Sequence, residues 1–270
     1  MAQHTGNAPG DGWTIDTVGD ELLACEAQRR DRVRFTEEWP ELDLATGYAI
    51  QDRNLAARLE RGEKLVGVKL GLTSRAKQQQ MGVHSPFVAW LTDAMVLPAG
   101  DPVPQHRLIH PRVEPELAFV MGDRLEGPGV TAARAMAAVE SVWGAAEIVD
   151  SRYRNFSFRA GDVVADNASS GAFVTGPIGL PPFALDLSLE AVLVEIGGAV
   201  VDSATGAAVQ GHPGEALAWA ANELAGRGQA IEAGWIVLTG GMTEAVACPP
   251  GASVALHFTH LGSVFLNGGA

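Results

Sequence analysis

The chain has 270 residues, a hydrophobic content of 47% and a formal net charge of −13. This length suits one large domain, or a domain with a small appendage, that buries a substantial core. Because a protein that neutralises phosphates needs a basic surface, the acidic charge argues against general nucleic-acid binding.

The two cysteines, Cys25 and Cys248, are isolated in the sequence and provide neither a disulfide framework nor the spacing of a zinc site. The first residues lack the apolar segment of a secretory signal, and no apolar run approaches the ~20 residues that a membrane helix needs. We therefore expect a cytoplasmic protein that does not enter a membrane.

The N-terminal quarter is expected to be helical. Residues 1–13 are polar and rich in glycine, which is typical of a disordered tail. Amphipathic patterns predict helices at about 16–34 and 44–61, where Gly62 ends the second. We expect residues 1–64 to pack as a tail and helical segment on a β-rich catalytic domain over residues 65–270.

The rest of the chain is expected to be mostly strands. Strands are predicted at 64–72, 113–120, 144–151, 193–196, 235–239, 254–258 and 261–266, helices at 127–143 and 213–226, and short irregular elements over 78–97. Strands and helices do not alternate strictly, which favours an α+β fold over a doubly wound sheet.

Two glutamates in an apolar strand are the clearest chemical signal. Glu114 and Glu116 lie two residues apart, so in a strand their carboxylates point to the same face, ~7 Å apart. Such a pair alone is more often two solvated surface groups. The apolar flanks change this, and Glu147 lies in a second apolar stretch. Three carboxylates shielded from water repel one another, and their oxygen atoms favour the binding of a hard divalent cation, Mg²⁺ or Mn²⁺.

Lys69 is the second candidate, because it interrupts the apolar run 66–72. A buried lysine is rarely left unpaired, so it would bind a substrate carboxylate or polarise a 2-oxo group; the alternative is a lysine on an edge strand whose head reaches water. The small and hydroxyl residues of segment 164–171 suit contact with a ligand, although an ordinary turn has the same composition.

Six stretches resemble the 2-oxopent-4-enoate hydratase and 4-oxalocrotonate decarboxylase family, within the fumarylacetoacetate hydrolase superfamily. They are VGVKLGLTSRAKQQQMGV, LIHPRVEPELAFV, EIVDSRYRNFSF, VVADNASSGAFVTG, GHPGEALAWAANELAGRGQAI and LTGGMTEAV, and together they span about residues 40 to 265. The resemblance implies a mixed β-roll or distorted-barrel core with flanking helices.

The resemblance also implies roles for individual residues. Mg²⁺ or Mn²⁺ would be held by Glu114, Glu116 and Glu147. Lys69 and Asp166 would be catalytic, and the substrate-binding residues would be Leu70, Ser169 and Thr239.

Two branches of the family share this site. The segments LIHPRVEPE, DSRYRNFSF and LTGG are closer to the decarboxylases, since hydratases resemble LIQPRAEGE in the first of them. We therefore expect a metal-dependent decarboxylase that converts 2-oxo-3-hexenedioate (4-oxalocrotonate), or a close analogue, to 2-hydroxypenta-2,4-dienoate and CO2. The alternative is a hydratase that converts 2-hydroxypenta-2,4-dienoate to 4-hydroxy-2-oxopentanoate. The pathway would be aromatic catabolism or a specialised biosynthesis, and the resemblance implies a homo-oligomer and association with a hydratase partner.

Other classes are less well supported by the residues. Residues 127–132 formally match G-x-G-x-x-A before a helix, with Asp150 about twenty residues on, as in dinucleotide-binding enzymes. That motif requires a direct turn from strand to helix, whereas a polar loop at 122–126 and Pro128 intervene. No G-x-S-x-G of a serine hydrolase is present. A non-catalytic scaffold would not need Lys69 together with three buried glutamates.

Overall fold

Two long helices open the described part of the chain. The computed structural model describes residues 12–74, 78–79, 83 and 85–269, so the expected tail lies outside the described residues up to residue 11. Helix α1 (Ile15–Gln28) begins at Thr14, whose side chain accepts a hydrogen bond from the Thr17 amide, and it ends at Arg29, whose φ is 51°. It is therefore shorter than the predicted 16–34. Helix α2 (Leu44–Glu60) is capped by Asp43 and agrees with its prediction.

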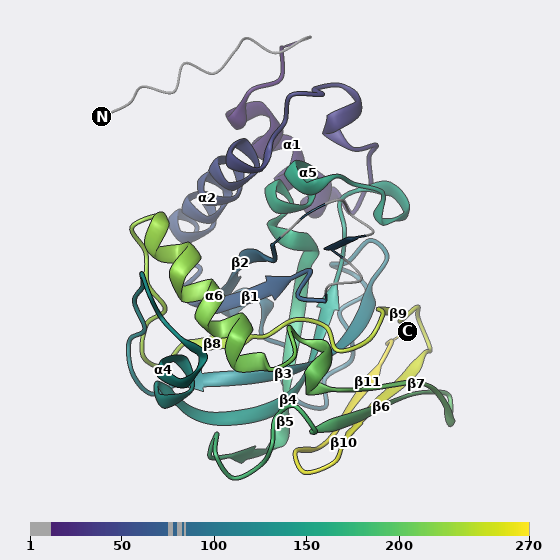
Figure 1. Cartoon of the computed structure of the whole chain (residues 1–270). Helices are drawn as coiled ribbons and strands as arrows, with labels where there is room; N and C mark the ends of the chain where they lie inside the picture. The colour runs from purple at the N-terminus through teal and green to yellow at the C-terminus, as the bar shows by residue number, and fades with distance from the viewer. Residues whose placement is uncertain (1–11, 75–77, 80–82, 84, 270) are drawn as a thin grey trace.

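The N-terminal helices pack beside a short helix from the middle of the chain, α5 (Ala160–Ala165), above the main sheet in Figure 1. Gly47 of α2 approaches α5 so closely that a Cβ would lie 2.6 Å from the Gly161 carbonyl oxygen. The Gln51 amide donates to the carbonyls of Val88 and Val164, which ties α2 to the sheet and to α5. The predicted domain boundary at residues 64 and 65 stays a prediction.

A mixed seven-stranded sheet forms the centre of the molecule. Its strands are β1 (Leu65–Gly71), β2 (Phe87–Thr92), β3 (Arg112–Met121), β4 (Val139–Val149), β5 (Ser170–Leu180), β8 (Ile236–Leu238) and β9 (Val246–Ala247). The order is β2-β1-β8-β3-β4-β5, with β9 beside β3, and among the pairings of these described strands with one another only β1–β8 is parallel. Since this path ends at β2 and β5, the described strands form a roll and not a closed barrel.

A second, antiparallel sheet has the order β11-β10-β6-β7. It is built from β6 (Ala191–Ile196), β7 (Ala199–Thr205), β10 (Ser253–Phe258) and β11 (Gly262–Asn267), and β11 packs against β4 and β5. Helix α6 (Pro213–Gly226) begins with proline after the His212 cap, as predicted, and packs on α4 (Ala132–Ala137). The largest apolar cluster joins both sheets and α6.

The α+β class with mixed sheets is confirmed, but three element predictions are wrong. The helix predicted at 127–143 stops at Ala137, because the β-branched Val139 begins β4 and pairs with Met121 of β3. The stretch expected to be irregular contains β2, in which every residue is buried. The sequence analysis also missed β7, which follows the tight turn at 197–198.

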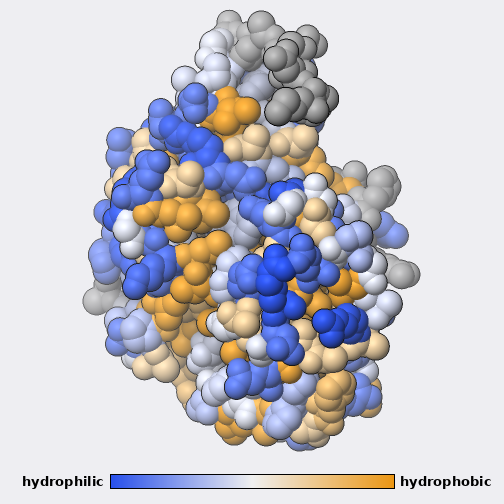
Figure 2. Space-filling view, turned by 90° about the vertical axis from the view of Figure 1, so that its left-hand side faces the viewer, coloured by the Kyte–Doolittle hydropathy of each residue, from blue (hydrophilic) through white to orange (hydrophobic). Residues whose placement is uncertain are grey.

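The described surface is mixed in polarity. Figure 2 shows hydrophilic and hydrophobic residues interspersed over one face, with no large uniform field. Among the described residues, no helix is both long enough and apolar enough to cross a bilayer.

Candidate active site

Three glutamates meet on one face of the central sheet. Glu114 and Glu147 are directly opposite each other in the antiparallel pairing of β3 with β4, and Glu116 lies two residues further along β3. One carboxylate oxygen from each lies within 4.8 Å of the others. The shared face of Glu114 and Glu116, which the alternating pattern predicts, is therefore present, and Glu147 joins them from the neighbouring strand.

The burial of these carboxylates is unfavourable without a cation. Glu116 is 0% exposed and Glu147 is 1% exposed. Burial, with repulsion from Glu147 and Glu114, raises the pKa of Glu116 well above its usual value. Burial also raises the pKa of Glu147, although the ammonium of Lys69 opposes this. The Oε1 atom of Glu116 accepts no hydrogen bond from the described residues. Hard oxygen donors in this arrangement fit Mg²⁺ or Mn²⁺.

Lys69 approaches the same cluster from β1. Its side chain is 3% exposed, and its Nζ lies 2.8 Å from Oε1 of Glu147. The Nζ also donates to the carbonyl oxygen of Ala168 at 2.5 Å. The ammonium is thus held by one carboxylate and one carbonyl. This excludes the alternative in which Lys69 extends from an edge strand into water.

Two glycines after β8 shape the other side of the cluster. The Gly240 amide donates to Oε2 of Glu116 at 2.7 Å. At Gly241, an added Cβ would lie 2.7 Å from Oε2 of Glu114. A Cβ at Gly240 would instead lie 2.1 Å from the Thr73 hydroxyl oxygen, so a side chain at either glycine would displace a neighbouring group.

A cleft of about 220 Å³ opens beside the glutamates. Leu70 and Ser169 line it, as the sequence predicts for substrate-contacting residues, together with Lys69 and Glu114. The hydroxyl of Ser169 is buried and has no hydrogen-bond partner among the described residues. The other lining residues are Gly71, Leu72, Thr73, Phe87, Arg112, Val149, Phe156, Phe158, Val163, Ala168, Gly241, Glu244 and Ala245.

Four predicted site residues are not among the lining residues: Glu116 and Glu147, which belong to the glutamate cluster, and Asp166 and Thr239. The Asp166 carboxylate accepts hydrogen bonds from the backbone amide and the Nε of Arg152. Burial raises the pKa of Asp166 to about 6, although Arg152 opposes this shift. The Thr239 hydroxyl donates to the Leu117 carbonyl at 2.9 Å. Because both groups are engaged inside the fold, direct contact with substrate is not supported for either.

Arg112 is a cleft residue that the sequence analysis missed. Its guanidinium carbon lies 4.2 Å from the ring centroid of Phe156, a cation–π contact that holds it at the cleft. Arg112 precedes Glu114 by two residues on β3, so the same alternation that joined Glu114 with Glu116 also predicts its direction.

The dinucleotide motif has no structural counterpart. Residues 127–131 form an irregular connection, and α4 after it has only six residues. The carboxylate of Asp150 instead accepts hydrogen bonds from the amides of Ile109 and His110 and holds their loop.

Comparisons with known proteins agree with this geometry. Residues 64–265 match the model of the fumarylacetoacetate (FAA) hydrolase C-terminal family. The chain is 44% identical over 247 residues to a 4-oxalocrotonate decarboxylase from Pseudomonas putida, covering 92% of this chain and 94% of that protein. It is 41% identical over 211 residues to a 2-hydroxypent-2,4-dienoate hydratase from the same species, covering 78% and 95%.

A solved structure of similar overall shape is the 4-oxalocrotonate decarboxylase of Pseudomonas putida G7, complexed with magnesium and adipate. It superposes with a TM-score of 0.91 at 39% identity and covers 95% of this chain and 98% of that one. The family model, the identities and the shared architecture together show that this chain belongs to the fumarylacetoacetate hydrolase family.

Proposed function

We propose that this chain is a Mg²⁺- or Mn²⁺-dependent decarboxylase that converts 2-oxo-3-hexenedioate, or a close analogue, to 2-hydroxypenta-2,4-dienoate and CO2. One observation carries the proposal: Lys69 and Glu114 line one cleft, and their side chains belong to a single cluster with Glu116 and Glu147. The similarity to decarboxylases over more than nine tenths of the chain supports the substrate class. Glu114, Glu116 and Glu147 would hold the ion.

The reaction needs a place for negative charge. When the C5–C6 bond breaks and CO2 leaves, its electron pair moves through the alkene to the C2 oxygen. A bound divalent ion would supply Lewis-acid polarisation of that oxygen. Lys69, oriented by Ala168 and Glu147, is positioned to stabilise the developing charge, and protonation of the oxygen completes the product.

The cleft also offers groups for the rest of the substrate. The Ser169 hydroxyl is available to donate to a substrate oxygen. Arg112 gives the cleft a second cation besides Lys69, which suits a substrate with two carboxylates. Apolar side chains such as Leu70 and Val149 limit the access of water.

A direct assay tests this proposal. The purified protein is incubated with 2-oxo-3-hexenedioate and Mg²⁺, with and without a chelator, while CO2 release and substrate absorbance are followed. We expect chelator-sensitive CO2 release. Lys69→Met should lower kcat by roughly 10²–10³-fold, as for the loss of an oxyanion donor, and should still bind Mg²⁺ in calorimetry. An unchanged kcat in Lys69→Met would refute its assigned role.

Hydration is the second candidate, supported by the similarity to a hydratase. It would use the same ion and cleft but add water to 2-hydroxypenta-2,4-dienoate. Consumption of that compound, without CO2 release from 2-oxo-3-hexenedioate, would favour the hydratase over the decarboxylase.

The remaining expectations are proposals of the same kind. We propose that the protein is cytoplasmic, acts in aromatic catabolism, forms a homo-oligomer and associates with a hydratase. Exposed apolar side chains on the second sheet, Leu193, Val200 and Phe265, support a homo-oligomer.

A further inference from the structure

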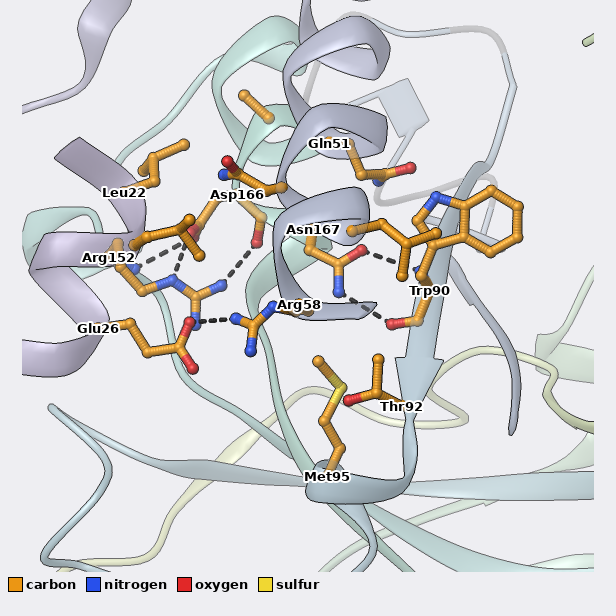
Figure 3. Close-up of a pocket in the computed structure, with 14 residues that line it drawn as sticks. Leu22, Glu26, Gln51, Arg58, Trp90, Thr92, Met95, Arg152, Asp166 and Asn167 are labelled. Atoms are coloured by element: carbon orange, nitrogen blue, oxygen red, sulfur yellow. Dashed lines mark hydrogen bonds and ion pairs between the residues drawn. The ribbon is translucent and has the colours of Figure 1, made fainter. Parts of the chain in front are cut away.

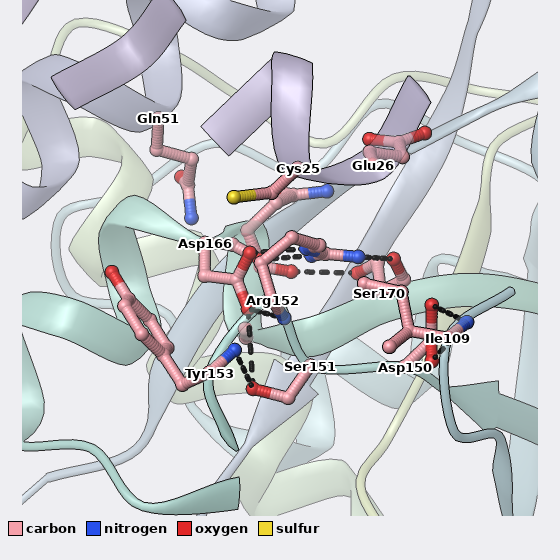
Figure 4. Close-up of polar contacts among 12 residues, drawn as sticks. Cys25, Glu26, Gln51, Ile109, Asp150, Ser151, Arg152, Tyr153, Asp166 and Ser170 are labelled. Carbon is pink, nitrogen blue, oxygen red and sulfur yellow. Dashed lines mark hydrogen bonds and ion pairs between the residues drawn. The ribbon is translucent and has the colours of Figure 1, made fainter. Parts of the chain in front are cut away.

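A buried ion pair lies behind the cleft. Arg152 is 4% exposed and Asp166 is 2% exposed. The Nε of Arg152 donates to Oδ1 of Asp166, and its backbone amide donates to Oδ2 at 3.1 Å. Its two terminal nitrogens donate to the carbonyl oxygens of Asp166, at 2.6 Å, and Ser170, at 3.0 Å. A single guanidinium therefore holds both ends of the segment 166–170 (Figure 4).

The segment between those ends has an unfavourable backbone. Asn167, Ala168 and Ser169 have φ values of 48°, 48° and 59°, a left-handed region that L residues avoid. Three such residues in a row persist only where the surroundings restrain them. The side-chain amide of Asn167 donates to the Trp90 carbonyl oxygen and accepts from the Trp90 backbone N–H, both at 2.9 Å (Figure 3). Arg152 supplies the other restraint.

The restrained segment contributes two groups to the site. The Ala168 carbonyl accepts a hydrogen bond from the Nζ of Lys69, and Ser169 lines the cleft. The Ser169 carbonyl accepts from the Asp150 amide at 2.7 Å, so its neighbours are fixed while its hydroxyl remains available. Any shift of this backbone would move the acceptor that orients the ammonium.

We propose that Arg152 is a positioning residue, which with Asp166 clamps the left-handed segment 167–169 so that the Ala168 carbonyl orients Lys69 for the reaction. This inference rests on the proposed function. It assigns Asp166, predicted from the family resemblance to be catalytic, an indirect role through Arg152, and it explains why that carboxylate lies outside the cleft.

The matched control is Arg58, another largely buried arginine in the same region. It pairs with Glu26 and Glu63, and it makes no hydrogen bond to the segment 166–170. Figure 3 shows Arg58 beside Arg152 and Glu26. Arg58→Gln therefore removes an ion pair of Glu26, a carboxylate whose charge also acts on Arg152, but it leaves every hydrogen bond between Arg152 and the segment 166–170 in place.

The experiment compares Arg152→Gln, Arg152→Lys and Arg58→Gln in the full chain. We expect Arg152→Gln to lower kcat by roughly 10–100-fold with a smaller effect on KM, because a small misplacement of a charge-stabilising group is costly. Arg152→Lys keeps the charge but cannot reach both Asp166 and Ser170. Its kcat should therefore lie between those of the wild type and Arg152→Gln. Arg58→Gln should keep a kcat near that of the wild type even where its thermal stability decreases.

A second readout does not depend on turnover. The chain has three lysines, Lys64, Lys69 and Lys77, so 13C-lysine labelling gives few signals, and Lys69→Arg assigns the one of interest. The Lys69 Cε resonance should shift in Arg152→Gln and Arg152→Lys but not in Arg58→Gln. In a Lys69→Met background, the added Arg152→Gln change should have no further effect on the residual kcat.

The outcomes distinguish a failure of the Arg152 clamp from a failure of the proposed function. Folded Arg152 variants with an unchanged Lys69 resonance and unchanged kcat would overturn the clamp. If Arg152→Gln does not fold, Arg152→Lys decides on the same readouts. If the wild type neither decarboxylates nor hydrates, the proposed function fails, whereas the Lys69 resonance still tests whether Arg152 positions that side chain.

Discussion

At the scale of single residues, the site contains buried polar atoms that lack a hydrogen-bond partner among the described residues. Glu116 has a buried oxygen that accepts no hydrogen bond from the described residues, and the Ser169 hydroxyl is in the same situation. Buried polar groups normally find partners inside a protein, so each exception calls for an explanation, and a bound ion and substrate would supply one for these two groups. Thr239 and Asp166 are the contrast, since their polar atoms are engaged within the fold.

Ser169→Ala tests this distinction. If its hydroxyl donates to a charged substrate oxygen, its removal should cost about 1.5–3 kcal/mol, which is roughly a 10–100-fold loss of kcat/KM. Ser263→Ala, on the second sheet beside His257, is the control and should leave steady-state kinetics unchanged. If kcat/KM of Ser169→Ala equals that of Ser263→Ala, Ser169 does not contact substrate.

At the scale of elements, the site depends on which strands become neighbours. Glu114 and Glu116 come from β3 and Glu147 from the adjacent β4. Lys69 comes from β1, which is three places from β4 in the sheet. At a strand spacing of ~4.8 Å, three places amount to roughly 14 Å in a flat sheet. The curvature of the roll allows the ammonium to reach Glu147.

The connection after β8 provides a test at this scale. Gly241→Ala would place a methyl group 2.7 Å from the Glu114 carboxylate and displace it. We expect the affinity for Mg²⁺ to fall by roughly 10–100-fold, as for other changes that disturb the orientation of metal ligands. Gly226→Ala, at the end of α6 with no atom within 4 Å, is the matched control. Isothermal titration calorimetry should separate the variants; identical affinities would contradict the proposed ion site.

At the scale of the whole molecule, ion binding and folding should be coupled. The apo protein buries carboxylates that repel one another, and a cation that binds only the folded state stabilises it. At an ion concentration of 100 times Kd this amounts to about 2.7 kcal/mol. For a domain of this size, Tm should rise by roughly 5–10 °C.

Differential scanning calorimetry with Mg²⁺ and with a chelator measures that shift. Glu116→Gln should abolish most of the Mg²⁺-induced rise in Tm. The variant loses one anionic ligand, and with it the repulsion between this carboxylate and its neighbours Glu114 and Glu147. A wild-type Tm that does not respond to Mg²⁺ or Mn²⁺ would argue against the ion.

Assembly is the second property of the whole molecule. Phe265 is 68% exposed and Val200 is 58% exposed, both on the second sheet. If this sheet is covered by another copy of the chain, Phe265→Asp should reduce the sedimentation coefficient without a loss of secondary structure. A monomeric wild type in sedimentation velocity would remove the basis for this prediction.

The sequence by itself determined the α+β class, most of the long elements and the placement of Glu114 and Glu116 on one face of a strand. Period-two alternation in an apolar stretch places side chains on one face whatever the sheet becomes. Helix propensity misled the sequence analysis at residues 139–143, which were assigned to a helix but pair with β3 as the first part of β4. The tertiary structure alone decided that Lys69 meets Glu147, that Arg112 enters the cleft, and that Asp166 is held by Arg152. These contacts join segments between 14 and 78 residues apart, and neither spacing nor propensity encodes the curvature and loop paths that bring them together.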